Sequence, residues 1–134
     1  MRVSAIHHHS VVVTDLSRAR AFYRDVLGLR EIAAPPSFGG RVAWFALADQ
    51  QLHLLHAAQA EPRGERHVAL HVDDAAAAGR ELAARGIAVE PGGPIPGAER
   101  IFIHDPDGNR IELICWRRPW DETVRDLGLT APTV

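Results

Sequence analysis

The stretch His67-Val-Ala-Leu-His-Val-Asp-Asp74 decides the fold, because a version of it occurs twice in this chain. Fifty-nine residues earlier the sequence reads His8-His-Ser-Val-Val-Val-Thr-Asp15, so in both copies a histidine stands seven residues before an aspartate. The apolar run between these two polar residues predicts a β-strand in each copy. The same offset relates His53 in Leu-His-Leu to Glu112 in Ile-Glu-Leu. Four potential metal ligands therefore fall at two pairs of repeat-equivalent positions.

The order of elements is also repeated. Asp15 and Asp74 are good N-caps for amphipathic helices, and Gly28 and Gly86 favour the left-handed conformation that ends such helices. Each half therefore reads as one strand, one helix and three further strands. The expected strands are 6–13, 29–33, 42–47, 52–55, 67–72, 87–90, 101–104 and 111–116, and the expected helices are 16–27, 75–85 and a short one over 119–127, with a frayed end at 131–134.

This order predicts an α+β fold built from two βαβββ modules. We expect one domain over 1–134, with module one at about 5–57, a linker at 58–66, module two at 67–116 and a C-terminal extension at 117–134. A single helix covers only one face of a four-stranded sheet, so the other face needs a partner or forms a cup. Paired modules forming an open, barrel-like cup satisfy this requirement.

Composition excludes several classes of protein. The 134 residues are 46% hydrophobic and 24% charged with a formal net charge of −2, which disfavours a nucleic-acid surface. No apolar run approaches the length that spans a bilayer, about 20 residues, and the first residues lack a signal-peptide core. The lone Cys115 has no internal disulfide partner, which is compatible with a reducing compartment, so we expect a cytoplasmic protein. The expected partner is a small-molecule substrate.

Strand alternation predicts which side chains face the cup. In the second half, Val68, Leu70 and Val72 suit the helix side, so His67 and His71 face the cup. The repeat then places His8 in the cup and leaves His7 and His9 outside it. In the last strand of each half, His53 and Glu112 fall on the cup side, with Trp116 also there. Ser10 reads as a small cup-lining residue, and Cys115 falls on the helix side.

Two motifs resemble those of the vicinal oxygen chelate (VOC) superfamily, which includes glyoxalase I, methylmalonyl-CoA epimerase, fosfomycin-resistance proteins, extradiol dioxygenases and bleomycin-resistance proteins. The opening motif is His8 with Asp15-Leu16 and Ala21-Phe-Tyr-Arg-Asp-Val-Leu-Gly-Leu29, and the closing motif is Asp105-Pro-Asp-Gly-Asn-Arg-Ile-Glu-Leu113. The resemblance runs from about residue 5 to 116. It implies paired modules around a divalent metal, with His8, His67 and Glu112 at ligand positions, and a homodimer that often builds its site from two chains.

His53 departs from the family pattern, because glyoxalase I-like members typically have glutamate there. One histidine in a strand is more often structural than a ligand, but nothing in core packing requires polar residues at all four positions. We therefore expect His8, His53, His67 and Glu112 to bind Zn, Ni, Co, Mn or Fe. His71 reads as a partner of a ligand, a general base or simply a packed histidine. Trp44 and Trp116 read as pocket walls or as core.

Three neutral imidazoles and one carboxylate around a divalent ion make a Lewis acid for a substrate with adjacent oxygens. If His53 coordinates, isomerase, lyase or epimerase chemistry through a metal-stabilised oxyanion is favoured. If it does not, the triad of His8, His67 and Glu112 resembles that of non-haem iron oxygenases, and His53 or Glu112 is free to act as a base. The leading hypothesis is a glyoxalase-like metal enzyme; the alternatives are an extradiol-type dioxygenase and a metal-free protein that sequesters an antibiotic.

Overall fold

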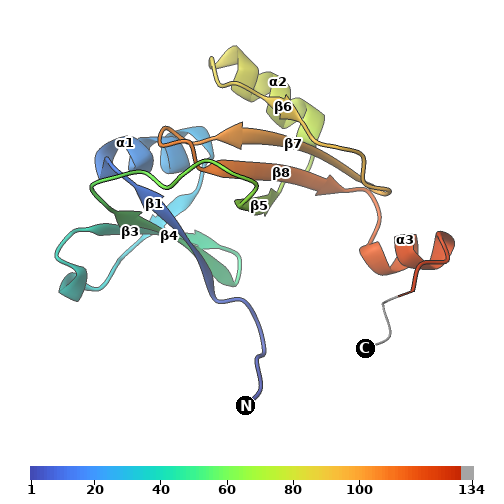
Figure 1. Cartoon of the computed structure of the whole chain (residues 1–134), viewed down its shortest axis with the longest axis horizontal. Helices are drawn as coiled ribbons and strands as arrows, with labels where there is room; N and C mark the ends of the chain where they lie inside the picture. Colours follow the sequence, from blue (N-terminus) through green and yellow to red (C-terminus); the bar gives the residue numbers. More distant parts are fainter. Residues whose placement is uncertain (131–134) are drawn as a thin grey trace. The chain divides into compact units, whose positions relative to one another are not determined.

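The computed structural model describes residues 1–130 as two units, each with a four-stranded sheet and one or two α-helices (Figure 1). The first unit comprises residues 1–66 and 104–110, and the second comprises residues 67–103 and 111 onward. The expected frayed end, 131–134, lies outside the described residues. Among the described helices, none is long and apolar enough to cross a membrane. The predicted α+β fold with two βαβββ modules is confirmed, and each sheet is open.

The first sheet has the strand order β1-β4-β3-β2. Strand β1 runs parallel to β4, whereas β3 pairs antiparallel with both β4 and β2. The strands are β1 (His8–Val13), β2 (Arg30–Ile32), β3 (Val42–Leu47) and β4 (Gln50–His56).

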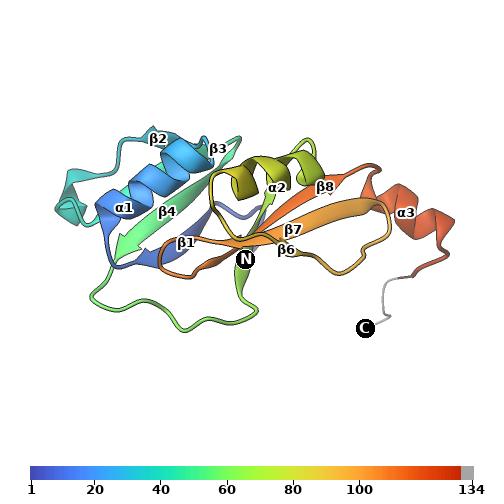
Figure 2. The ribbon, with the colours of Figure 1, turned by 90° about the horizontal axis from the view of Figure 1, so that it is seen from above.

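Helix α1 (Leu16–Ala21) lies across one face of this sheet, as Figure 2 shows. Asp15 caps it as predicted, because its Oδ1 accepts from the Arg18 backbone N–H at 2.9 Å. The predicted helix over 16–27 continues as a π-helical turn, η1 (Phe22–Val26), which sequence periodicity did not indicate. Gly28 follows at φ 71° in the left-handed conformation that commonly ends a helix. A 3-10 turn, η2 (Pro36–Phe38), interrupts the expected loop.

The core of the first unit lies between α1 and the sheet. Its side chains alternate along the strands, so one face of the sheet is apolar and the other holds the polar residues. The buried residues on the helix side are Val11, Val13, Ala43, Phe45, Leu52 and Leu54, with Ala19, Phe22 and Tyr23 above them.

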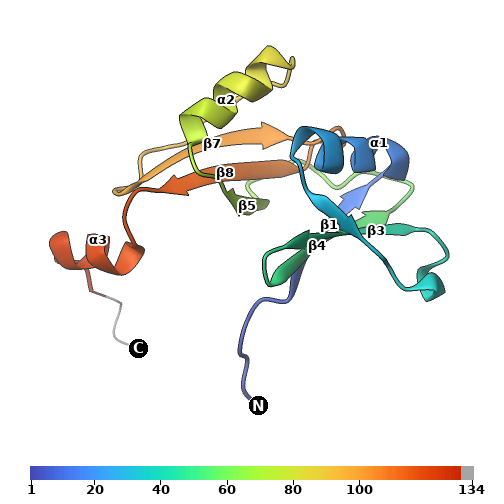
Figure 3. The same cartoon turned by 180° about the vertical axis from the view of Figure 1, so that it is seen from behind.

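The second sheet repeats the order as β5-β8-β7-β6. Its strands are β5 (His67–His71), β6 (Glu90–Pro91), β7 (Ala98–His104) and β8 (Arg110–Trp116). Helix α2 (Ala75–Ala84) covers one face, and α3 (Trp120–Asp126) follows β8 at the red end of Figure 3. Asp74 caps α2 by accepting from the Ala77 backbone N–H at 2.8 Å.

Two strand predictions in this half are wrong in extent. The strand expected at 87–90 begins only at Glu90, and the strand expected at 101–104 begins three residues earlier, at Ala98. Because of the second error, Arg100 was left outside the predicted strand. Strand alternation over the full strand places it on the same face as Phe102 and His104.

Candidate functional site

Each unit brings together one of the two predicted ligand pairs. In the first unit, β1 and β4 are adjacent parallel strands, and the register sets Ser10 opposite His53 and His53 opposite Trp44. The imidazoles of His8 and His53 stack with centroids 4.2 Å apart and planes inclined by 17°. Strand alternation predicted that His8 and His53 lie on the same face of the sheet, and this contact agrees with that prediction.

His53 is buried, at 6% exposure, although it is a polar side chain. Its other face stacks on the Trp44 indole at 4.1 Å and 3°, and Trp44 in turn contacts Phe38 at 5.9 Å. Nε2 of His53 lies 2.8 Å from Oε1 of Gln51, so Nε2 carries the proton when that amide oxygen is the acceptor. Burial lowers the pKa of His53 below its ordinary value, and the neighbouring His8 and His7 imidazoles lower it further. His53 is therefore neutral at pH 7, as a metal ligand must be.

His7 is closer to these residues than the sequence predicted. Its Nδ1 lies 2.9 Å from Nδ1 of His8, and the two rings meet edge to face. His7 was predicted to lie off the site, and the structure shows that it contacts the candidate ligand His8. The reason is that β1 begins at His8, so the alternation of a strand does not extend to His7.

In the second unit, His67 and Glu112 lie on the neighbouring strands β5 and β8. The His67 Nε2 donates to Glu112 Oε2 at 2.9 Å, and the Glu112 side chain is only 6% exposed. Arg100 NH1 donates to the other carboxylate oxygen, Oε1, at 3.2 Å. The Phe102 ring lies edge to face with His67 at 5.4 Å. Sequence reasoning found the histidine and the glutamate but missed both Arg100 and Phe102.

The spacing of the second pair suits a divalent ion, although one of its side chains must turn first, because Nε2 of His67 points at Oε2 of Glu112 in their hydrogen bond. Two donor atoms that share one ion at bond lengths of about 2.1 Å lie about 3 Å apart, which is close to the Nε2–Oε2 separation here. The first pair fits only after a change of rotamer. Imidazole lone pairs lie in the ring plane, so two nearly parallel stacked rings do not direct them to a common point. His8 is exposed and has room to turn. Within residues 1–130, no three His, Cys, Asp or Glu side chains gather closely enough to hold an ion.

The other predicted residues fall as follows. His71 is exposed at the end of β5, and Trp116 contacts Trp120 of the terminal helix at 5.7 Å rather than a ligand residue. Cys115 is buried on the helix side as expected, and its thiol donates to the Asp73 carbonyl at 3.0 Å.

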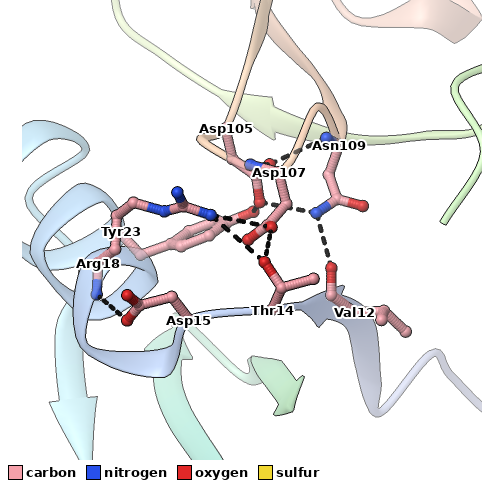
Figure 4. A network of polar contacts seen from close by, with 8 residues as sticks. All are labelled: Val12, Thr14, Asp15, Arg18, Tyr23, Asp105, Asp107 and Asn109. Atoms are coloured by element: carbon pink, nitrogen blue, oxygen red, sulfur yellow. Dashed lines mark hydrogen bonds and ion pairs between the residues drawn. The ribbon is translucent and has the colours of Figure 1, made fainter. Parts of the chain in front are cut away.

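The closing motif makes a polar network inside the first unit (Figure 4). Tyr23 O–H donates to Asp105 Oδ2 at 3.0 Å, and both residues are buried. Burial, followed by the charge of Asp105 and this hydrogen bond, raises the pKa of Tyr23 far above its ordinary value. Asn109 Nδ2 donates to Asp105 Oδ2 and to the Val12 carbonyl, each at 2.8 Å.

Asp107 completes this network at the start of α1. Its Oδ1 accepts from Thr14 Oγ1 and from Arg18 NH2, the latter at 3.0 Å. Its Oδ2 is buried and has no hydrogen-bond partner. These contacts hold the turn at 104–110 within the first unit. The closing motif is therefore structural in its own contacts.

Comparison with known proteins adds the following. The family model described as Glyoxalase/Bleomycin resistance protein/Dioxygenase superfamily matches residues 5–113. The chain is 30% identical to the mitochondrial methylmalonyl-CoA epimerase of Mus musculus over 84% of this chain and 73% of that protein. It is 32% identical to the lactoylglutathione lyase of Salmonella typhimurium over 80% of this chain and 89% of that protein. The crystal structure of TnmS3, an antibiotic-binding protein from Streptomyces sp. CB03234, superposes with a TM-score of 0.73 at 32% identity over 87% of this chain and 98% of that one.

Proposed function

Because this chain belongs to the Glyoxalase/Bleomycin resistance protein/Dioxygenase superfamily, we propose that it is a metal-dependent enzyme acting on a small molecule with adjacent oxygens. The observation that supports this most is the pair formed by His67 and Glu112. The Glu112 carboxylate is almost fully buried and lies 2.9 Å from an imidazole nitrogen, so two side-chain types that bind divalent metal ions meet on neighbouring strands. The similarity to a lyase and an epimerase favours isomerase, lyase or epimerase chemistry.

In this proposal the ligands are His8, His53, His67 and Glu112, as the repeat predicts. A bound divalent ion would act as a Lewis acid on two adjacent substrate oxygens. Glu112 supplies the negative charge, and the neutral imidazoles leave the ion with a net positive charge. His53, neutral at pH 7, is also placed to accept a proton if it does not bind the ion. His71, exposed on β5, is the second candidate for this proton transfer.

We further propose that the enzyme is a cytoplasmic homodimer. The single cysteine fits a reducing compartment. The two ligand pairs come either from one chain or from two copies, and mixed dimers distinguish these cases. If the site is shared, a mixture of His8→Ala and Glu112→Gln chains forms some dimers with one intact site and regains metal binding. If each chain holds its own site, the mixture binds no more metal than the single variants.

The test of the main proposal is metal content after reconstitution, measured by elemental analysis on the wild type and three variants. We expect about one ion per site in the wild type, loss of that ion in His67→Ala and Glu112→Gln, and retention in His56→Ala. His56 is the matched control, because it is an exposed histidine at the end of the same strand as His53. Wild-type protein that binds no divalent ion would refute the proposal.

The reaction class is tested by solvent deuterium exchange into methylmalonyl-CoA and lactoylglutathione with the loaded protein. Exchange at the carbon next to the carbonyl supports epimerase or lyase-type chemistry. Oxygen uptake with a catechol and Fe(II), without such exchange, would favour the dioxygenase alternative.

A second candidate function is sequestration of an antibiotic without metal. It is favoured by the similarity to TnmS3 and by the stack of three rings formed by His8, His53 and Trp44, with Phe38 tilted against Trp44. Such a stack offers a flat aromatic surface on which a planar molecule can stack. Binding of a planar antibiotic that is unchanged by EDTA, in protein without bound ion, would support this candidate over the enzyme.

A further inference from the structure

Arg100 is held in place from three sides in the second unit. Its NH1 donates to Glu112 Oε1 at 3.2 Å, and its Nε donates to the Gly93 carbonyl at 3.0 Å. Its guanidinium carbon lies 5.4 Å from the centre of the Phe102 ring, in the range of a cation–π contact. A side chain with this many fixed contacts is pre-organised rather than a mobile surface charge.

The neighbouring backbone is shaped around this side chain. A Cβ added to Gly92 would lie 2.4 Å from Cγ of Arg100 and 2.9 Å from its carbonyl oxygen, distances that real contacts do not reach. A Cβ on the next residue, Gly93, would meet NH2 of Arg100 at an ordinary 3.6 Å. Only glycine at position 92 therefore leaves Arg100 where it is.

The two oxygens of Glu112 are thus divided between two partners. Oε2 faces His67, and Oε1 is occupied by Arg100. A carboxylate binds a divalent ion through one oxygen or through both. When a guanidinium N–H occupies one oxygen, only the other is available to the ion.

We propose that Arg100 is a positioning residue that keeps Glu112 a one-oxygen ligand, with Oε2 presented beside His67. This inference rests on the proposed metal-dependent function. Its chemical consequence is that Glu112 does not close a coordination position that a substrate with adjacent oxygens needs. Arg100 thereby acts through Glu112 and sets how many positions remain open for a two-oxygen ligand.

The experiment uses the full chain loaded with Co²⁺ and the bidentate probe acetohydroxamate, which presents two adjacent oxygens. The wild type is compared with Arg100→Met, which keeps an unbranched side chain but loses the guanidinium, and with Gly92→Ala, which displaces Arg100 without changing any charge. Gly93→Ala is the matched control. The readouts are the visible spectrum of bound Co²⁺, whose intensity falls as coordination number rises, and the affinity for acetohydroxamate at saturating Co²⁺.

We expect Arg100→Met and Gly92→Ala to bind acetohydroxamate about 10-fold more weakly than the wild type, with a weaker Co²⁺ spectrum, and Gly93→Ala to match the wild type. Wild-type affinity and spectrum in Arg100→Met would overturn the inference while leaving the metal function intact. Arg100→Met alone decides the question if Gly92→Ala does not fold. Failure of the wild type to bind Co²⁺ at all would instead refute the proposed function, and this inference with it.

Discussion

Replacing Tyr23 with phenylalanine tests the buried network around the closing motif. The change removes one hydroxyl and leaves the ring, so it creates no cavity. The lost interaction is the hydrogen bond from Tyr23 O–H to the Asp105 carboxylate, 3.0 Å long and buried at both ends. A hydrogen bond to a charged group contributes about 1.5–3 kcal/mol. Asp105 keeps its hydrogen bonds from the Asn109 amide and from two backbone N–H groups. We therefore expect Tyr23→Phe to lower the free energy of unfolding by about 2 kcal/mol at pH 8.

The same contact makes this loss depend on pH. The pKa of Tyr23 is raised in the folded state above the ordinary value of 10.0, so the folded protein keeps the phenolic proton after the unfolded chain has released it. The stability that Tyr23 contributes is therefore complete below pH 10 and is lost as the pH rises above it, at about 1.4 kcal/mol per pH unit. The difference between wild type and Tyr23→Phe should shrink to about 0.6 kcal/mol at pH 11.

Urea denaturation of both proteins at pH 8, 10 and 11 measures this difference. Tyr23 is the single tyrosine of the chain, so the ultraviolet absorbance of tyrosinate reports its ionisation directly. The folded wild type should show no tyrosinate signal at pH 11, whereas the urea-unfolded protein should titrate near pH 10. A stability difference that stays constant from pH 8 to pH 11, or a folded-state titration near pH 10, would refute the reasoning.

Three further changes test other contacts. The part of the acid quenching of tryptophan fluorescence that His53→Leu abolishes should have its midpoint below pH 6.5, because burial and the neighbouring imidazoles lower the pKa of His53, which stacks on Trp44. A midpoint at or above 6.5 would contradict the lowered pKa. Gly97→Ala should lower the free energy of unfolding, measured by thermal denaturation, by about 1–3 kcal/mol. The reason is that φ of Gly97 is 82° and the new Cβ would lie 2.7 Å from Thr123 Oγ1. Gly64→Ala, with nothing within 4 Å, is its control, and equal melting temperatures would argue against this account. Arg18→Met should lower the free energy of unfolding by about 1 kcal/mol, because Arg18 is half exposed but the side chain of its partner Asp107 is buried. Arg24→Met is the control and should leave the unfolding midpoint unchanged, because both Arg24 and its partner Asp25 are exposed.

Strand alternation and the internal repeat were sufficient to predict the fold and to predict which candidate residues lie on the same face of each sheet. The parity of His8 with His53, and the contact of His67 with Glu112, follow from residues on neighbouring strands, which the repeat identifies. Arg100 was missed for a local reason, since Ala98 and Glu99 are weak strand formers and the strand was predicted to begin after them.

Other features depend on contacts that no local pattern indicates. Tyr23 reads from sequence as one more apolar residue on a helix, and its partner Asp105 stands 82 residues away. The stacking of His53 between His8 and Trp44 depends on side-chain rotamers, which sequence periodicity does not specify.

The turn at 104–110 belongs to the first unit although the strands on either side of it belong largely to the second. The first unit is thus built from two separate segments of chain, because the Val12 carbonyl, Thr14 and Tyr23 form hydrogen bonds with residues of the 105–109 segment. A ribosome that has synthesised the chain only as far as Arg66 has not yet supplied those partners. We therefore expect the first unit to reach its native state during synthesis only after Asn109 leaves the exit tunnel, and a chain cut in the 58–66 segment to yield a first fragment that does not fold by itself.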